Sequence, residues 1–133
     1  MKSVFSLLAI AAVLLFSSSI QKKNTASGCE MTVTYAELAH AAFKKAYKAS
    51  SIEDATPLLK DGVAKASEAS AYAISPKCNC DIAKNYALNA VTFGNKALKT
   101  SDLAELKKLT KKAMDMSLDV LTATPNCGAE KSK

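Results

Sequence analysis

The four cysteines carry the most evident chemistry of this chain, and two of them, Cys78 and Cys80, are one residue apart. Thiolates can bind zinc, exchange disulfides or form permanent disulfide bonds. Structural zinc sites prefer spacings like C-x-x-C, and redox motifs carry C-x-x-C at a helix start, so C-x-C is one residue short of both patterns. An even number of cysteines in a small exported chain is typical of structural disulfides. We therefore predict two disulfides, with a four-thiolate zinc site and catalytic disulfide exchange as alternatives.

The N-terminus has the three parts of a secretory signal peptide. Lys2 gives a positive start, residues 4–16 form an apolar run broken only by Ser6, and three serines follow at 17–19. A bilayer span needs about 20 apolar residues, so this run is too short for one. We predict a signal peptide at 1–19 and an extracytoplasmic protein, periplasmic or secreted, with no integral membrane segment in the mature chain.

Two other interpretations of the N-terminal region compete with simple cleavage. The apolar run could be a buried helix, although the polar, serine-rich residues after it are typical of a linker, which we place at 20–28. Cys29 follows the small residues Ala26, Ser27 and Gly28, as a lipid-attachment cysteine would. Twelve polar-rich residues separate Cys29 from the apolar run, however, and this favours cleavage over lipid anchoring.

From residue 33 onward the apolar residues recur at helical spacing, and no stretch alternates convincingly as a strand would. The pattern therefore predicts an all-α chain with four amphipathic helices. Their apolar stripes include Tyr35, Ala39, Phe43 and Ala46; Leu59, Gly62, Val63 and Ala66; Ala83, Ala87, Ala90 and Gly94; and Leu106, Leu109, Ala113 and Met116.

Helix-end signals separate these stripes. Asp102 with Glu105 three residues later predicts the start of the last helix, because both side chains can satisfy free backbone N–H groups. The sequences SPKC (75–78) and TPNC (124–127) predict the ends of the second and fourth helices, since a residue before proline leaves helical geometry. Thr56-Pro57 predicts the start of the second helix, and a start near Ser50 with Glu53 as capping partner competes.

The chain contains an internal repeat. A shift of 51 residues aligns 35–52 with 86–103 at seven identities, and after a two-residue contraction Pro76-x-Cys78 falls on Pro125-x-Cys127. We predict two duplicated helical hairpins, 29–78 and 80–127, packed as an up-and-down four-helix bundle stapled by disulfides. Residues 128–133 are expected to be a disordered tail.

The repeat also predicts how the cysteines pair. The start of the first helix and the end of the second lie at the same end of a hairpin, so the pairs Cys29–Cys78 and Cys80–Cys127 would each close one hairpin. If all four thiols converge at one end, Cys29–Cys80 with Cys78–Cys127 is the next possibility. A Cys78–Cys80 bond would close a very tight ring and is least favoured.

His40 is the only histidine, and it borders the apolar stripe of the first helix. Its plain interpretation is a boundary residue. Some four-helix bundles hold haem, which makes His40 a possible axial ligand with Met31, Met114 or Met116 as its partner. No C-x-x-C-H attachment sequence is present, and alanine-lined helices offer little room for an unattached haem. We therefore expect no metal and no cofactor.

Four lysines form a basic stripe at i, i+4 spacing on the fourth helix, next to Asp115 and Asp119. The stripe is either a solvated face or a docking surface for an unknown protein or another anionic surface. Nucleic acid is not expected as a partner, because the chain is exported and aromatic residues are not interleaved with the lysines. The stripe consists of Lys107, Lys108, Lys111 and Lys112.

No arrangement of nucleophile, base or metal ligands is visible, so we expect no enzyme activity. The leading hypothesis is a small exported helical binding or interaction domain. The alternative is a carrier of a ligand or cofactor, such as haem or a small apolar molecule, in the bundle interior near His40. A third class, an enzyme whose site is formed by residues far apart in the sequence, has no supporting motif.

Overall fold

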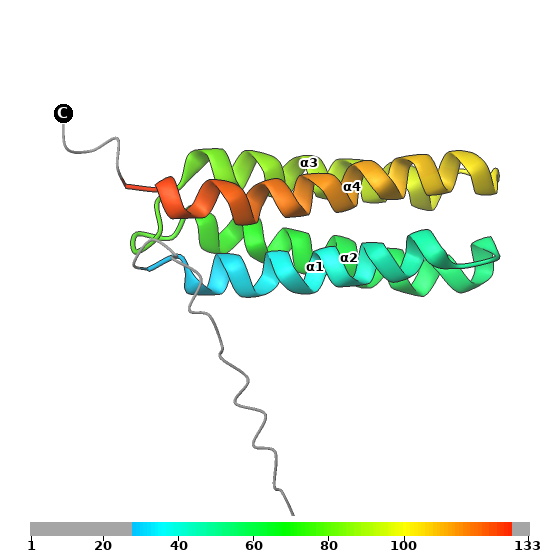
Figure 1. The fold of residues 1–133 in the computed structure, drawn as a ribbon, viewed down its shortest axis with the longest axis horizontal. Coiled ribbons are helices and arrows are strands. Elements are labelled where there is room, and N and C mark those ends of the chain that lie inside the picture. The colour runs from blue at the N-terminus through cyan, green and yellow to red at the C-terminus, as the bar shows by residue number, and fades with distance from the viewer. Residues whose placement is uncertain (1–27, 129–133) are drawn as a thin grey trace, which may run out of the picture.

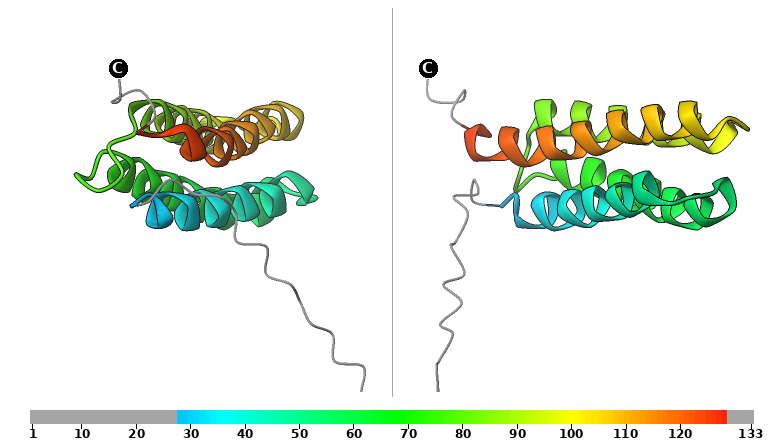
Figure 2. Two further views of the ribbon diagram at one scale, coloured as in Figure 1. Left: turned by 60° about the vertical axis from the view of Figure 1, so that its left-hand side comes forward. Right: turned by 45° about the vertical axis from the view of Figure 1, so that its right-hand side comes forward.

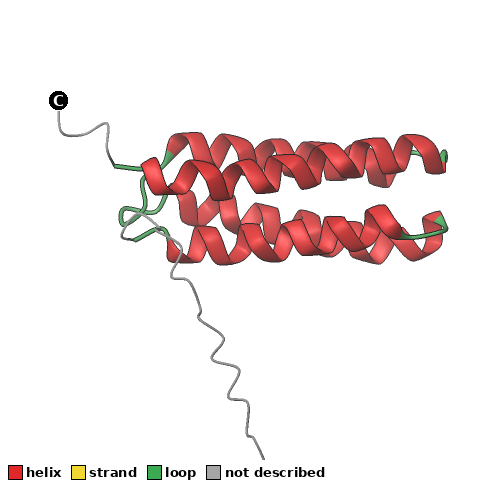
Figure 3. Ribbon diagram, in the orientation of Figure 1, coloured by secondary structure: helices red, strands yellow, loops and turns green. Residues whose placement is uncertain are grey.

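A computed structural model describes residues 28–128 of the chain. The predicted signal peptide, residues 20–27 of the predicted linker and residues 129–133 of the predicted tail lie outside the described residues. Within 28–128 the structure contains helices and no strand (Figure 3). The elements are α1 (Glu30–Lys48), α2 (Ile52–Ala73), α3 (Asp81–Lys99), α4 (Leu103–Ala123) and a short 3₁₀ helix η1 (Thr124–Asn126).

The four helices form an up-and-down bundle (Figures 1 and 2). Helix α1 packs against α2 and α4, and α3 packs against α4 and α2, with few contacts along the diagonals. The short α1–α2 and α3–α4 connections lie at one end, which we call the far end. The α2–α3 connection lies at the other, which we call the disulfide end. The predicted all-α four-helix bundle is thus confirmed.

Side-chain caps begin the two helices at the far end. The Asp102 carboxylate accepts a hydrogen bond of 2.7 Å from the backbone N–H of Glu105, which confirms the predicted start of α4. The hydroxyl of Ser51 accepts one of 3.1 Å from the N–H of Asp54 and begins α2. The same type of cap therefore starts the second helix of each hairpin.

The predicted start of α2 at Thr56-Pro57 is wrong, because α2 begins at Ile52 and Pro57 lies in its second turn. The competing start near Ser50 is one residue from the observed cap. Ala55 and Leu59 are fully buried, so the helix has to begin early enough to place both on its inner face. The proline is exposed on the outside of the helix, where water can reach the carbonyl left without its N–H partner.

The backbone repeats as the sequence does. Adding 51 to the bounds of α1 (30 and 48) gives the bounds of α3 (81 and 99), and adding 51 to the start of α2 (52) gives the start of α4 (103). The buried positions coincide as well, since Ala36, Ala39 and Ala46 are buried in α1 and their equivalents are buried in α3. The two hairpins therefore use the same helix faces for the core.

The core is built mainly from alanine, which accounts for 14 of the 21 buried hydrophobic residues in the described part of the chain. Small side chains let the helices approach closely but remove little apolar area from water per residue. Phe43 is the largest side chain that is fully buried. Its place in the second hairpin is taken by Gly94, so the repeat is broken at the centre of the bundle.

Two glycines leave the space that Phe43 fills. A Cβ added to Gly62 would lie 2.6 Å from Cε1 of Phe43. One added to Gly94 would lie 2.5 Å from Cγ2 of Val63 and 3.1 Å from Cε1 of Phe43. Three helices thus meet at this aromatic ring, and both glycines are required by close packing.

We predict that Gly62→Ala destabilises the protein, although alanine favours a helix over glycine by about 1 kcal/mol. Overpacking a well-filled core costs about 1–3 kcal/mol, and the Phe43 ring has no exposed side toward which to move. We expect a net loss of about 1 kcal/mol in the free energy of unfolding, measured by urea denaturation. Ser67→Ala, at an exposed position of α2, is the control and should not destabilise.

The same loss should shrink when Gly62→Ala is combined with Phe43→Leu, because the smaller side chain makes room for the new methyl group. Strictly additive effects of the two substitutions, or a Gly62→Ala variant as stable as the parent, would contradict this view of the core.

Candidate functional site

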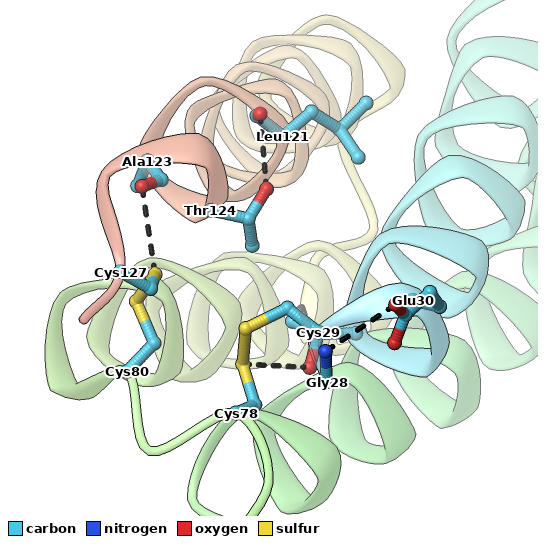
Figure 4. The surroundings of a disulfide bond; sticks show 10 residues. Gly28, Cys29, Glu30, Cys78, Cys80, Leu121, Ala123, Thr124 and Cys127 are labelled. Carbon is cyan, nitrogen blue, oxygen red and sulfur yellow. Dashed lines mark hydrogen bonds between the residues drawn. A yellow bond between two sulfur atoms is a disulfide. The ribbon is translucent and has the colours of Figure 1, made fainter. Parts of the chain in front are cut away.

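Two disulfides lie side by side at the disulfide end (Figure 4). Cys29 is bonded to Cys78 with a Cα–Cα distance of 4.5 Å, and Cys80 to Cys127 with a Cα–Cα distance of 5.2 Å. This is the pairing that the repeat predicts. All four cysteines are bonded, so none offers the free thiolate that a zinc site would need.

Asn79 forms the turn between the two disulfides. Its φ of +47° is in the left-handed region, which asparagine tolerates better than most residues. Its N–H donates to the carbonyl of Ser75 at 2.8 Å, and the N–H of Cys80 donates to the carbonyl of Ala73 at 2.7 Å. The C-x-C sequence is therefore a tight structural junction between the hairpins.

The two disulfides differ in their exposure to solvent. Cys29, Cys78 and Cys80 are buried, whereas Cys127 is half-buried beside the 3₁₀ helix at the end of the described chain. The hydroxyl of Thr32 also covers the sulfur of Cys78, at 3.7 Å. The Cys80–Cys127 bond is thus the one that a reductant can reach.

We predict that limited reduction opens Cys80–Cys127 before Cys29–Cys78, because thiol–disulfide exchange needs access to a sulfur atom. The native protein would be treated with a small excess of dithiothreitol, alkylated at intervals and analysed by mass spectrometry. Cys127 should be labelled first. First labelling of Cys29 would contradict the difference in exposure.

The start of α1 is held by a carboxylate. The N–H of Gly28 donates to Oε1 of Glu30 at 3.3 Å. Hydrogen bonds from the N–H groups of Glu30 and Gly28, with a smaller contribution from the charge of Lys77, lower the pKa of the Glu30 carboxyl below its ordinary value of 4.5. Gly28 has a φ of +94°, and a Cβ there would meet the backbone carbonyl of Lys77.

The lowered pKa of Glu30 predicts a pH-dependent contribution to stability. A carboxyl whose folded-state pKa is depressed stabilises the protein above its unfolded pKa and stops doing so as the pH falls through the folded value. The parent should be more stable than Glu30→Gln at pH 7, and the difference should shrink below pH 4.5. Urea denaturation of both proteins from pH 7 to pH 3 measures it, and a pH-independent difference would count against the proposed ionic cap.

His40 is half-buried where α1 packs against α4, and its Nδ1 lies 3.2 Å from the backbone carbonyl of Met114. Met31 is on the same helix nine residues earlier, about 13 Å along the axis, too far to bind the same iron. The adjacent interior is filled by buried side chains that include Ala39, Phe43 and Ala113. A ligand bound inside the bundle would have to displace them.

The four lysines of the predicted stripe on α4 have different surroundings in the structure. Lys108 lies 3.5 Å from the carboxylate of Glu105, and Lys111 lies 2.8 Å from that of Asp115. The hydrogen bond and charge of Asp115 raise the pKa of Lys111 above its ordinary value. These two lysines have local ionic partners, whereas Lys107 is half-buried and Lys112 turns toward α3.

Lys112 meets Phe93 and Lys96 on the side where α3 and α4 pack. The ammonium of Lys112 lies 5.3 Å from the centre of the Phe93 ring, and that of Lys96 lies 5.7 Å from it. Both lysines are exposed and the ring is half-buried. Among residues 28–128 no carboxylate lies within ion-pair distance of either ammonium group.

Charge is unevenly distributed along the bundle. The far half (40–62 and 91–113) has ten lysines and five carboxylates, whereas the remaining half of 29–127 has three lysines and six carboxylates. Within the far half the excess belongs to the second hairpin, where 91–113 has six lysines and two carboxylates. The equivalent part of the first hairpin, 40–62, has four lysines and three carboxylates. We call the six lysines of 91–113 the lysine face: Lys96, Lys99, Lys107, Lys108, Lys111 and Lys112.

The predicted stripe missed Phe93 and Lys96, which lie on another helix. The repeat holds the signal that could have found the cluster, because Phe93 aligns with Ala42 and Lys112 aligns with Asp61. Ala42 is buried, whereas Phe93 is half-buried against the core, so the two hairpins differ here in both packing and charge.

No family model, curated protein or solved structure matches this chain. Within the described residues there is no cluster of histidine, cysteine and acidic side chains suited to a metal ion. None of the helices of 28–128 is both long and apolar enough to cross a bilayer.

Proposed function

We propose that this protein is a small exported binding domain, without a catalytic role, that docks to an anionic partner through the lysine face. The observation that carries the proposal is the charge of 91–113, which has six lysines and two carboxylates, with Asp115 just beyond the segment as the partner of Lys111. Complementary charge guides association and fixes orientation, which suits a rigid scaffold with its charge at one end.

The simpler interpretation of the lysines is a solvated surface, and the repeat argues against it. Both hairpins have helices that start at equivalent positions and bury the same faces, yet the equivalent segment of the first hairpin is nearly balanced in charge. Folding and solubility are therefore served without the extra lysines. The excess charge of the second hairpin then needs another reason, and recognition of an anion supplies one.

Export is part of the proposal. Two disulfides indicate an oxidising, extracytoplasmic environment. Together with the signal-like sequence of residues 1–19, this favours secretion or release into a periplasm. We keep the carrier hypothesis as an alternative. It would require the bundle to open beside His40, and the contact of His40 with Met114 gives it no specific support.

Reversal of the charge of the lysine face should abolish binding to polyanions. We expect the parent to be retained at about 0.15 M salt on at least one of three probes: immobilised poly-glutamate, a sulfated polysaccharide, or vesicles of anionic phospholipid. Glutamate at Lys107, Lys108, Lys111 and Lys112 should remove that retention.

The first hairpin provides a control with the same change in net charge. Glutamate at four exposed lysines, Lys44, Lys45, Lys48 and Lys60, should leave most of the binding intact. Equal loss in both variants would show an effect of net charge alone and contradict the proposal, as would a parent protein that binds none of the probes.

A further inference from the structure

On the lysine face, two ammonium groups lie near a single aromatic ring. We propose that Phe93, Lys96 and Lys112 form the contact point for an acidic segment of a protein partner, one in which an apolar residue stands next to carboxylates. This inference rests on the proposed function and names the site and the partner class within it.

The cluster contains both parts that such a contact needs, which are cations for the carboxylates and an aromatic ring for the apolar residue. Lys96 comes from α3 and Lys112 from α4, and their ammonium groups lie 5.7 Å and 5.3 Å from the centre of the same ring. An exposed cation–π contact is worth only about 0.5–1 kcal/mol, so either ammonium can readily turn to a carboxylate. The half-buried ring then offers an apolar surface close to two cations.

Two other lysines of the two-helix surface are less available. Lys108 and Lys111 already have carboxylates of their own helix at 3.5 Å and 2.8 Å. Lys112 and Lys96 have no such partner among the described residues. A carboxylate arriving from outside would therefore find two ammonium groups beside Phe93 that no carboxylate of the described residues occupies.

The first hairpin shows what the same place looks like without the cluster. Ala42, Lys45 and Asp61 occupy the positions of Phe93, Lys96 and Lys112, on helices that start at equivalent positions. Ala42 is buried, whereas Phe93 is a larger side chain that remains half-exposed. The first hairpin thus folds with alanine and aspartate at these positions, whereas in the second hairpin the Phe93 ring packs against the core with one part and remains accessible with another.

A protein segment fits this surface better than a lipid bilayer does. Membrane-surface helices insert exposed apolar side chains, and the exposed large apolar residues of the described chain all lie outside 91–113. Protein interfaces, in contrast, combine an aromatic anchor with surrounding charges. The exposed apolar residues are Met31, Leu38, Tyr47, Ile74, Ile82, Leu88 and Leu118.

The test uses a fluorescent peptide in which glutamate and leucine alternate, with binding to the disulfide-intact protein followed by anisotropy at about 0.15 M salt. The variant Phe93→Ala/Lys112→Asp copies the residues of the first hairpin and should weaken binding roughly tenfold or more. Lys60→Asp/Ser67→Ala changes the charge equally at exposed positions of α2, outside the lysine face, and should weaken it less than threefold. Circular dichroism would show that both variants retain the helical fold.

A second peptide separates the ring from the charges. Replacing leucine by serine should weaken binding to the parent, but should change binding little once Phe93→Ala has removed the ring. Equal effects of this replacement on parent and variant would overturn the role of Phe93. Tighter, Phe93-dependent binding of a sulfated polysaccharide would overturn the assignment to a protein segment.

Failure of this inference is distinguishable from failure of the proposed function. If glutamate at the four lysines of α4 abolishes retention on polyanions while Phe93→Ala/Lys112→Asp binds the peptide as the parent does, the lysine face stands and the contact point is wrong. If the parent protein binds neither the peptide nor any polyanion, both are wrong.

Discussion

The closure of each hairpin by its own disulfide is the constraint on which the rest of this structure depends. The bonds join residues 49 and 47 positions apart. In the chain-entropy model each such bond stabilises a fold by about 4 kcal/mol. The net stability of a domain is only about 5–15 kcal/mol, and this core is mostly alanine. The two disulfides therefore compensate for the small apolar area that the alanine side chains bury.

Closure at one end leaves the hairpins free to diverge elsewhere, and they have done so in the core and on the surface. In the core, Phe43 occupies space that its counterpart Gly94 vacates, since the centre of the bundle has room for one aromatic ring. Beside it, a half-buried Phe93 stands where the first hairpin has the buried Ala42, and the exposed Lys112 stands where it has Asp61. The Phe43 difference keeps the packing tight, whereas the Phe93 difference adds a ring that packs against the core and also reaches the surface.

Much of the fold could be predicted from the sequence because its signals are periodic. The apolar stripes indicate four helices, the repeat places them in two hairpins, and Pro76 and Pro125 stand just after the ends of α2 and α4. The start of α2 was misjudged because proline at the first helical position is a local preference. Burial of Ala55 and Leu59, a tertiary requirement, overrides it.

The candidate site was less accessible to sequence reasoning. Spacing on α4 identified four lysines as a stripe, but two of them form ion pairs with acidic residues of the same helix. The meeting of Lys112 with Phe93 and Lys96 depends on how α3 and α4 pack, which spacing along one helix does not show. Charge counts per segment and the mismatches between the hairpins were the available signals.

The pairing of the cysteines is the most direct test of the central claim that each hairpin is closed separately. Digestion after lysine under non-reducing conditions should release 24–44, 78–84 and 113–131 as one disulfide-linked complex. Fragmentation between Cys78 and Cys80 by mass spectrometry then separates the two bonds. We predict 24–44 on Cys78 and 113–131 on Cys80. The crossed result, with 24–44 on Cys80 and 113–131 on Cys78, would contradict the account.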